Sequence, residues 1–453
     1  DYRVPEKFSG VIVPGSVVLV PLGHQQALGI VAELAAASDL PDSRLVDVAS
    51  VVEFPSISEK LIALALWVAG YYYCSPAAAL GLVLPPGGLP ALVREGDGDD
   101  ACYTLKASQI RPRKLKFARM TERAAAVGTK LTPAQHRVME ILIHEGEAPL
   151  RELIVKAGVS ASPVKTLAAR GLVEIIEREV RRDGLRYYGE VAPDQSAIGG
   201  NAANVGANSS KIVSPHQLND AQQRALEAII SRLGEQDGAN RSRPILLEGV
   251  AGAGKTEVYL RAIEAAVAQG RKAIVLVPEI SLTNQAVKRF RRRFGNRIGI
   301  LHSGLSQGER YDEYMLIRSG EVDIVIGPRS ALFAPLPDLG IIVVDEENEG
   351  SYKQENDPRY DARRVAQQRA RLEGAVLIYG SATPSLESYH RVIDRFLLPE
   401  RATGAAMPEV EIVDMRKETD PVFSTRLIAE LDRNLSAGGK TILFSTHTMQ
   451  HAE

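Results

Sequence analysis

A glycine-rich octapeptide at residues 249–256 carries the most specific chemistry in this sequence. It reads Gly-Val-Ala-Gly-Ala-Gly-Lys-Thr, follows an apolar run at residues 244–248 and opens a stretch that favours a helix. Glycines in that context allow consecutive backbone N–H groups to curl around a phosphate, and the start of a helix adds its positive end. We expect Lys255 to neutralise nucleotide phosphates and the Thr256 hydroxyl to bind Mg²⁺. The predicted nucleotide site comprises Gly249, Gly252, Ala253, Gly254, Lys255, Thr256 and Glu257.

A second group of reactive side chains follows the apolar residues 341–344, where the sequence continues Asp345-Glu346-Glu347-Asn348. A buried strand that ends in carboxylates beside a phosphate loop places Asp345 to hold Mg²⁺, directly or through water. Glu346 can then polarise the attacking water as a general base. The alternative is a strand whose polar end simply meets solvent. The predicted catalytic residues are Lys255, Asp345 and Glu346, and the predicted metal ligands are Thr256 and Asp345.

Short apolar runs recur through residues 214–400, and these must form the elements that position the reactive groups. The runs lie at residues 245–248, 273–278, 298–302, 324–327, 341–345 and 376–380, with helical segments between them. Strands that alternate with helices predict a parallel sheet with crossover helices. We therefore expect residues 214–400 to form an α/β domain within a multidomain α/β chain.

The first half of the chain predicts two further domains and a linker. Residues 1–90 begin β-rich, with β-branched runs punctuated by Gly and Pro, and continue with an apolar helix at residues 58–73. Residues 129–195 predict three short helices and a hairpin with a turn at residues 181–184, which is a winged-helix pattern. Residues 196–213 are mostly Gly, Ala, Asn and Ser, a composition typical of a flexible linker.

The composition limits the classes of protein and the kinds of partner. The chain has 453 residues, 45% hydrophobic and 24% charged, which excludes global disorder. Its 54 Lys and Arg nearly balance its 56 Asp and Glu, so any nucleic-acid surface must be local. Two cysteines, Cys74 and Cys102, predict neither a disulfide framework nor a four-thiolate zinc site, and a cytoplasmic setting is the expectation. No apolar run approaches the roughly 20 residues that a membrane span needs.

The order of sequence blocks around the reactive groups is distinctive. After the phosphate loop come Leu-Val-Pro-Glu-Ile-Ser-Leu-Thr at 276–283 and Ile-Gly-Pro-Arg-Ser-Ala-Leu-Phe at 326–333. The acidic cluster is followed by Pro-Arg-Tyr at 358–360 and by Gly-Ser-Ala-Thr-Pro-Ser at 380–385. This set resembles the PriA family of bacterial replication-restart helicases in superfamily 2, over about residues 1–446.

The resemblance implies an ATP-driven 3′-to-5′ DNA helicase that recognises stalled forks and single strands in the bacterial cytoplasm, associated with the nucleoid. The implied partners are primosome proteins, the single-stranded DNA-binding protein and the replicative helicase. Residues 1–90 correspond to a domain that binds DNA 3′ ends, 214–400 to a RecA-like motor lobe and 401–453 to the start of a second lobe. The hydroxyls of Ser381 and Thr383 are implied to couple the nucleotide state to DNA. Gln222 is implied to pair with adenine, and the alternative is a surface glutamine on a helix.

The expected DNA contacts follow from the same resemblance. Asp1 and Gly23 are implied to line a pocket for a terminal 3′-hydroxyl, against the alternative of an ordinary exposed aspartate. In the loop after the acidic cluster, DNA contacts are predicted for Tyr352, Lys353, Arg359 and Tyr360, with bases stacked on the tyrosines. The alternative is a packed surface loop. Two basic runs, at residues 111–119 and 288–293, could track a phosphate backbone, but a linker and a solvated helix face are the favoured interpretations.

The sequence departs from the family pattern in several places. Asn348 stands where the family usually has His, Asp361 replaces another His, and Val46 stands where a pocket Lys is expected. The absence of His at position 348 puts the coupling of DNA binding to hydrolysis in doubt. The start at Asp1 rather than Met leaves open a longer natural N-terminus. The family's zinc-binding cysteines and most of its second lobe are expected to lie beyond Glu453, so we expect this chain to bind ATP better than it hydrolyses it.

Two other functions remain open at this stage. One is a nucleotide-binding scaffold for primosome assembly that binds DNA without unwinding it. Asn348 and the missing second lobe favour this interpretation, whereas the intact Gly254-Lys255-Thr256 and Asp345-Glu346 oppose it. The other is a small-molecule kinase, which accounts for the phosphate loop but not for the winged-helix pattern or the Gly-Ser-Ala-Thr block at residues 380–383.

Overall fold

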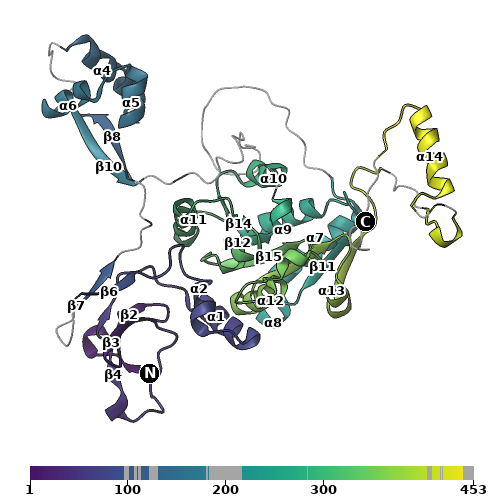
Figure 1. Cartoon of the computed structure of the whole chain (residues 1–453), viewed down its shortest axis with the longest axis horizontal. Coiled ribbons are helices and arrows are strands. Elements are labelled where there is room, and N and C mark those ends of the chain that lie inside the picture. Colours follow the sequence, from purple (N-terminus) through teal and green to yellow (C-terminus); the bar gives the residue numbers. More distant parts are fainter. Residues whose placement is uncertain are drawn as a thin grey trace. The chain divides into compact units, whose positions relative to one another are not determined.

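The computed structural model describes residues 1–95, 102–106, 110, 114–121, 131–179, 182, 217–282, 284–405, 411–418, 420 and 422–441. The chain divides into two compact units, Asp1–Thr403 and Gly404–Glu453, each described by itself (Figure 1). The linker predicted at residues 196–213 and most of the turn at 181–184 lie outside the described residues.

The first 90 residues hold a small sheet followed by two helices. Three strands pair antiparallel in the order β3-β2-β5, and β1 pairs in parallel with β4. Their bounds are β1 Tyr2–Arg3, β2 Val17–Leu22, β3 Gln25–Ile30, β4 Val46–Asp47 and β5 Ser50–Val51. Gly23 has a φ of +62° in the turn between β2 and β3, a conformation that glycine adopts at little cost.

Helix α1 (Glu59–Tyr72) confirms the apolar helix predicted at residues 58–73. The Ser58 hydroxyl caps it by accepting from the backbone N–H of Leu61, and its buried residues recur at helical spacing. That buried face contributes to the same apolar core as α12 (Ala362–Glu373) of the large sheet domain. Helix α2 (Pro76–Gly81) and the hairpin of β6 (Ala91–Glu95) with β7 (Cys102–Lys106) follow.

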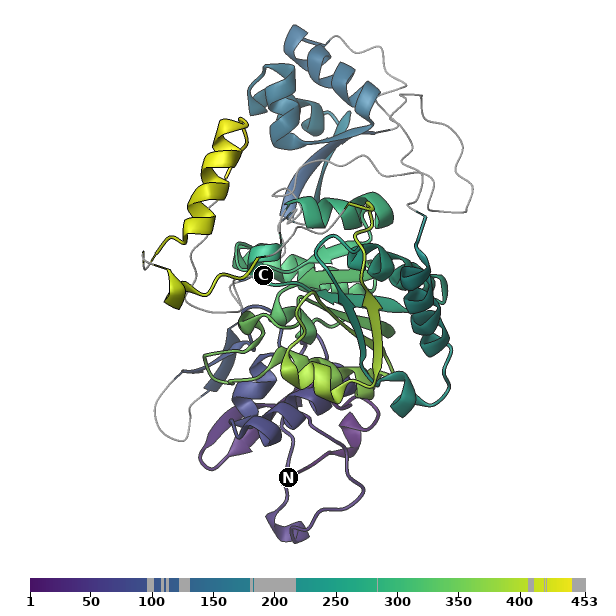
Figure 2. The same cartoon turned by 90° about the vertical axis from the view of Figure 1, so that its right-hand side faces the viewer.

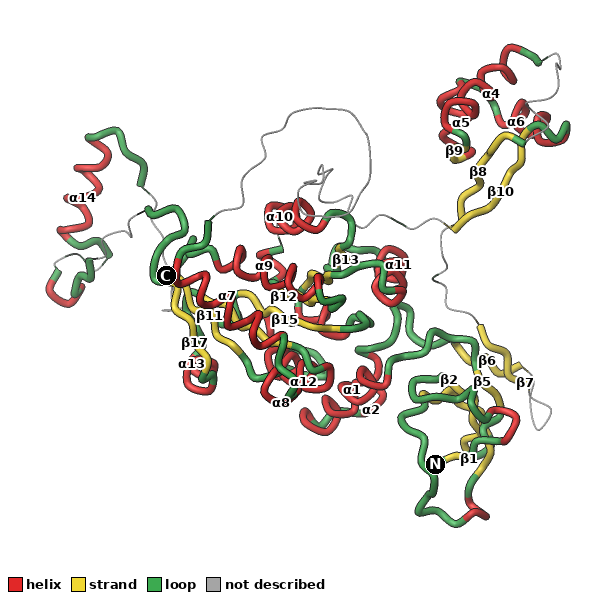
Figure 3. The backbone as a smooth tube through the Cα atoms, turned by 180° about the vertical axis from the view of Figure 1, so that it is seen from behind, coloured by secondary structure: helices red, strands yellow, loops and turns green. Residues whose placement is uncertain are grey.

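Residues 114–179 form a module of three helices and three short strands, which Figure 3 colours by secondary structure. The helices are α4 Pro133–Glu145, α5 Leu150–Ala157 and α6 Ala161–Ala169, and the sheet order is β10-β8-β9. Its strands are β8 Lys114–Met120, β9 Glu147–Pro149 and β10 Val173–Glu179. The linker interpretation of residues 111–119 is wrong for β8, because Arg119 and Lys116 pair with Glu174 and Glu177 across the β8–β10 ladder.

A seven-stranded sheet in the order β13-β14-β12-β15-β16-β11-β17 dominates the larger unit, and all its neighbouring strands are parallel. This confirms the predicted parallel α/β domain. The strands are β11 Ile245–Gly249, β12 Lys272–Leu276, β13 Ile298–Ile300, β14 Ile324–Gly327, β15 Leu339–Asp345, β16 Val376–Ser381 and β17 Asp394–Leu398. The sequence patterns missed β17, whose ribbon is the yellow-green arrow at the sheet edge in Figure 2.

Alternate residues of each central strand face two different cores. On β15, Ile342 and Val344 face the core shared with α12, while Ile341 and Val343 face the core shared with α9 (Lys255–Ala268) and α7 (Asp220–Leu233). Burial on both faces explains why these strands read as continuous apolar runs. The other helices are α8 Gly238–Arg241, α10 Asn284–Phe294, α11 Gln307–Ser319, α13 Leu386–Arg391 and, in the second unit, α14 Thr425–Ser436. None of the helices in the described ranges is long and apolar enough to cross a membrane.

Candidate functional site

The phosphate loop leaves β11 and turns into α9 at the carboxyl end of the sheet. Gly252 and Gly254 have φ values of +79° and +80°, and a Cβ on Gly254 would lie 2.4 Å from Nε2 of Gln222. Lys255 Nζ donates to the Gly249 carbonyl at 2.9 Å and lies 3.9 Å from Oε1 of Glu346. A backbone that only glycine tolerates, with a lysine folded over it, fits the phosphates of a nucleotide.

Gln222 lies in the first turn of α7 and is 3% exposed, so the surface-glutamine alternative is wrong. Its Oε1 accepts from the Asn219 N–H at 2.9 Å, and its Nε2 donates to the Ala253 carbonyl at 2.8 Å. These bonds hold the phosphate loop against α7. The amide nitrogen carries two N–H groups and this bond uses one of them, so contact with adenine stays a prediction.

Asp345 ends β15 and is held from two sides. The Tyr259 hydroxyl, on α9, donates to Oδ1 of Asp345 at 3.1 Å, and the Tyr352 hydroxyl donates to its backbone carbonyl at 2.6 Å. Burial, reinforced by the neighbouring Glu346 carboxylate, raises the pKa of Asp345 to about 6. A buried carboxylate with a fixed orientation and an unfavourable charge is well prepared to receive a divalent cation such as Mg²⁺.

Glu346 has a φ of +46°, a left-handed conformation that is strained for any residue other than glycine. Such strain persists when the surrounding structure fixes it, and it is concentrated at active sites. The side chain is 39% exposed, in contrast to Asp345 beside it. Glu346 can therefore reach water while facing Lys255, which is what the predicted general base requires.

The next two residues connect the acidic strand end to the Ser381-Ala382-Thr383 segment after β16. Asn348 accepts from the Ser381 hydroxyl at 2.6 Å and donates from Nδ2 to Oγ1 of Thr383 at 3.2 Å. Glu347 is fully buried and accepts from the Ser385 N–H at 2.6 Å and the Ser388 hydroxyl at 2.8 Å. The neutral amide of Asn348 thus joins the acidic strand end to the segment after β16, and the coupling of DNA binding to hydrolysis stays a prediction.

Glu257, a predicted nucleotide contact, has its carboxylate engaged by arginines of α9 and α10. Its Oε1 accepts from Nε of Arg261 at 2.9 Å and from Arg293 at 3.4 Å, and Arg293 also pairs with Glu264. The carboxylate therefore joins α9 to α10 and does not serve the phosphate loop. This pairing also accounts for one arginine of the basic run at residues 288–293, while Phe290 of that run is buried.

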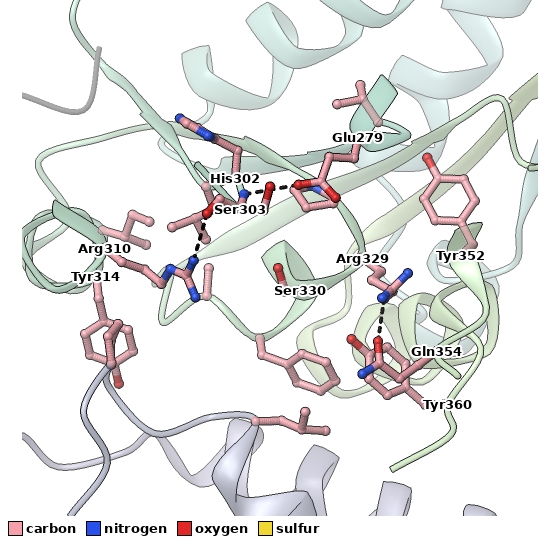
Figure 4. Close-up of a pocket in the computed structure, with 18 of the residues that line it drawn as sticks. Glu279, His302, Ser303, Arg310, Tyr314, Arg329, Ser330, Tyr352, Gln354 and Tyr360 are labelled. Atoms are coloured by element: carbon pink, nitrogen blue, oxygen red, sulfur yellow. Dashed lines mark hydrogen bonds between the residues drawn. The ribbon is translucent and has the colours of Figure 1, made fainter. Parts of the chain in front are cut away.

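A hollow of about 400 Å³ lies beyond the carboxyl ends of β12, β13 and β14 (Figure 4). Arg329 lies in its wall, where Nε donates to Oε1 of Gln354 and the NH1 group to the Ser351 carbonyl, both at 2.6 Å. Arg310 lies across the hollow and donates to the Ser303 carbonyl at 3.4 Å. The other polar lining residues include Glu279, His302 and Ser330.

The tyrosines predicted to stack DNA bases belong to the core beneath this hollow. Tyr352 is 1% exposed and Tyr360 2% exposed, with the Tyr360 ring packed edge-on against Phe333 at 5.2 Å. The stacking prediction is therefore wrong, because a buried ring offers no face to a base. Lys353 and Arg359 of the same loop are exposed, and their contact with DNA stays a prediction. Arg329 of the 326–333 block lines the hollow, although the sequence patterns did not predict it as a site residue.

In the N-terminal domain, Asp1 is exposed and its Oδ2 accepts from the Ser38 hydroxyl at 2.5 Å. The Tyr2 hydroxyl donates to the Pro21 carbonyl at 2.9 Å, which ties β1 to the hairpin that carries Gly23 at its turn. Val46, at the position of the expected Lys, pairs with Tyr2 in the β1–β4 register and is exposed. These residues lie on neighbouring elements, and their role in binding a 3′ end stays a prediction.

Two segments of this chain match known protein families. Residues 1–85 match the family described as 3′DNA-binding domain (3′BD), and residues 219–392 match the family described as DEAD/DEAH box helicase. Replication restart protein PriA of Bacillus subtilis (strain 168) is 34% identical over 507 residues, covering 98% of this chain and 60% of that protein. The protein of the same name from Synechocystis sp. is 33% identical, covering 98% and 58%. The chain thus spans about three fifths of the length of these relatives.

Proposed function

This chain belongs to the family of replication restart protein PriA, and we propose that it acts as an ATP-dependent 3′-to-5′ DNA helicase of replication restart. In this function the N-terminal domain binds the 3′ ends of DNA at stalled forks, and the sheet domain binds and hydrolyses ATP. Each activity has its own set of residues on the chain.

The observation that best supports this function is that Asp345 is bonded both to the phosphate-loop helix and to the loop beside the hollow. Its side chain is bonded to Tyr259 on the phosphate-loop helix, and its backbone to Tyr352. Tyr352 ends the short helix Gly350–Tyr352, and Gln354 just beyond it accepts from Arg329 in the wall of the hollow. A continuous set of bonds therefore runs from the hollow to the predicted metal ligand, as a motor that couples DNA to ATP requires.

At the nucleotide, each residue has a distinct task. Thr256 and Asp345 would hold Mg²⁺, which would supply charge neutralisation for the phosphates. Lys255 exchanges the Gly249 carbonyl for phosphate oxygens, and Glu346 orients and deprotonates the attacking water. The hydrogen bonds of Asn348 to Ser381 and Thr383 then couple the nucleotide-bound state of the acidic strand end to the segment after β16.

The hollow is suited to the backbone of single-stranded DNA. Arg310 and Arg329 supply positive charge from opposite walls, and Ser303 and Ser330 add hydroxyl groups that can bond phosphates. Arginine engages phosphate through its planar fork without reading the base, so binding here should be independent of sequence.

The scaffold alternative, which binds nucleotide and DNA without unwinding, is less favoured than the helicase. It rested on Asn348 and on the second lobe expected beyond Glu453, and the structure gives Asn348 bonds to both Ser381 and Thr383. Primosome proteins, the single-stranded DNA-binding protein and the replicative helicase remain the proposed partners, and the bacterial cytoplasm, with the nucleoid, the proposed location. No cluster of metal-ligating side chains occurs within the described ranges, so the zinc of the family is not assigned to residues of this chain.

DNA-stimulated ATP hydrolysis by the full-length product tests the proposed function. We expect single-stranded DNA to raise the ATPase rate, and Arg329→Ala to lower the ratio of stimulated to unstimulated rates by about tenfold, the value of a lost charge-assisted bond. Arg224→Ala, which removes an exposed arginine from α7, is the matched control. An ATPase rate that ignores DNA would contradict the motor function.

A further inference from the structure

Strand β17 and the residues after it run along the phosphate loop. Leu398 ends β17 opposite Gly249 in the parallel ladder, and its carbonyl accepts from the Val250 N–H at 3.4 Å. Three residues further on, the Ala402 N–H donates to the Gly252 carbonyl at 2.9 Å. Because both bonds fix backbone to backbone, residues 398–402 are held against the loop before any nucleotide arrives.

Arg401 lies within this fixed segment. A Cβ on Gly252 would lie 3.9 Å from Cγ of Arg401, so the arginine side chain passes beside the loop at the glycine whose φ is +79°. A Cβ on Gly254 would lie 3.3 Å from Cβ of Ala402, which shows that the same segment covers the loop on both sides of Ala253. The stem of the Arg401 side chain therefore lies beside Gly252 of the phosphate loop.

The Nε atom of Arg401 is buried and finds no hydrogen-bond partner among the described residues. Two other arginines share a buried, unpaired Nε, but each donates other N–H groups to carbonyls. Arg241 donates to Gly374 at 3.2 Å, and Arg369 donates to Ala334 at 2.8 Å. Within the described part of the chain, no bond of this kind engages the Arg401 side chain. A buried donor without a partner costs free energy, so its retention calls for an explanation.

The charge of the site supplies that explanation. Lys255 is the cation of the loop itself, and it shares the site with the carboxylates of Asp345 and Glu346. A nucleotide adds several negative charges, which one lysine does not balance. We infer that Arg401 is a nucleotide ligand that binds the phosphate chain from the β17 side of the loop.

This inference rests on the proposed function and adds a residue to its ATP site. A phosphate oxygen would satisfy the buried Nε and pair with the guanidinium charge at once. In the free chain the buried Nε makes no hydrogen bond with the described residues, so it contributes no bond to stability there. The two roles, ligand contact and structural support, therefore predict opposite results for the stability of the free chain.

The test uses the whole chain and a fluorescent ADP analogue, with affinity measured by titration at several salt concentrations. Arg401→Ala should weaken ADP binding by about tenfold and flatten its salt dependence, as expected for a lost charge-assisted bond. Arg401→Lys keeps the positive charge but lacks the paired N–H donors of the guanidinium, so its ADP affinity should lie between those of the parent chain and Arg401→Ala. Arg395→Ala is the matched control, because Arg395 lies on β17 but stacks over Tyr389 at 4.4 Å, away from the loop.

Thermal unfolding separates this role from a structural one. We expect Arg401→Ala to unfold at the temperature of the parent chain without nucleotide, and to show a smaller stabilisation by ADP. A lower melting temperature of the free variant together with normal ADP affinity would overturn the inference. Weakened binding with an unchanged salt slope would also overturn it, because the arginine would then contact the base. A parent chain that does not bind ADP overturns the proposed function itself.

Discussion

Asp345 and Asp1 are both carboxylates for which the sequence predicts a ligand, and they occupy opposite surroundings. Asp345 ends a strand in the middle of a seven-stranded sheet, is partly buried, and is fixed by the hydroxyls of Tyr259 and Tyr352. Asp1 lies next to a strand of two residues, is exposed, and accepts one bond from Ser38. The nucleotide site is thus organised before its ligand binds, whereas the 3′-end site offers separate groups on the surface.

The difference follows from the two kinds of sheet. Parallel strands bring their carboxyl ends to one edge, where loops from distant parts of the sequence meet. Burial of both faces then holds those loops in place. The N-terminal domain has a short antiparallel sheet and the two-residue parallel pair of β1 and β4, and a Cβ on Gly23 in its β2–β3 turn would meet no atom within 4 Å. Substitutions in the first site should therefore have large and specific effects, and those in the second site small ones.

Lys255→Ala should have the largest effect. Loss of the cation that pairs with the phosphates should reduce ATP hydrolysis by about 10³-fold and abolish measurable nucleotide binding. Binding of forked DNA through residues 1–195 should change little, since those residues lie outside the nucleotide site. ATPase assays and fluorescence anisotropy on one preparation check both parts, and a simultaneous loss of fork affinity would break the separation of the two sites.

Glu346→Gln in the full-length product should still bind ATP but hydrolyse it about 10²-fold more slowly, because an amide cannot act as a general base. Glu347→Gln is an informative comparison. Glu347 is buried and bonded to Ser385 and Ser388, so it cannot reach water and should affect stability more than chemistry. Single-turnover hydrolysis distinguishes the two, and near-normal rates for Glu346→Gln would assign the base elsewhere.

Tyr259→Phe tests whether prior organisation of Asp345 matters. The hydroxyl fixes Oδ1, and it fills the space that a Cβ on Gly380 would need, because such a Cβ would lie 1.4 Å from that oxygen. We expect the Mg²⁺ concentration for half-maximal ATPase to rise about tenfold, as for a lost bond to a charged group. Nucleotide binding without Mg²⁺ should be unaffected.

Tyr379→Phe is the control for this substitution. Tyr379 is also buried, and its hydroxyl donates to the Arg363 carbonyl at 2.9 Å, away from Asp345. Both variants lose one buried hydroxyl and should lose similar stability. Only Tyr259→Phe should change the Mg²⁺ concentration for half-maximal ATPase. The same Mg²⁺ dependence in both variants would show that Tyr259 contributes only packing.

The sheet and the phosphate loop could be predicted from sequence because their signals are local. Continuous apolar runs identify buried parallel strands, and the octapeptide at residues 249–256 specifies both its turn and its ligand. Strand β17 was missed because Asp394 and Arg395 interrupt its apolar pattern at the edge of the sheet. With β17 unseen, the approach of Arg401 to the loop could not be foreseen.

The roles of Tyr352 and Tyr360 were mistaken for the opposite reason. Both tyrosines lie at the hollow, in the loop after the acidic cluster, but a loop sequence does not say whether a ring faces solvent or core. Tertiary packing decided it, since Phe333 and the backbone of Asp345 are the partners of these tyrosines. The hydrogen bonds of Gln222 with Ala253 and of Asn348 with Thr383 could likewise not be predicted, because they join residues far apart in sequence.

The smallest effect is expected at the 3′-end site. If Asp1 accepts a hydrogen bond from a terminal 3′-hydroxyl, DNA that ends in 3′-phosphate should bind more weakly, because two anions then face each other. Asp1 is exposed and water screens that repulsion, so we expect a preference of only about two- to fivefold. Asp1→Asn should remove the preference while retaining binding, and Glu53→Gln, which neutralises an exposed carboxylate in the same domain, should leave it intact. Fluorescence anisotropy on two oligonucleotides that differ at the 3′ group measures it. A 3′-hydroxyl preference of about tenfold or more, as large as the effect expected for Tyr259→Phe, would contradict the comparison. It would show that bound DNA orders the predicted 3′-end site as fully as the sheet orders the predicted nucleotide site.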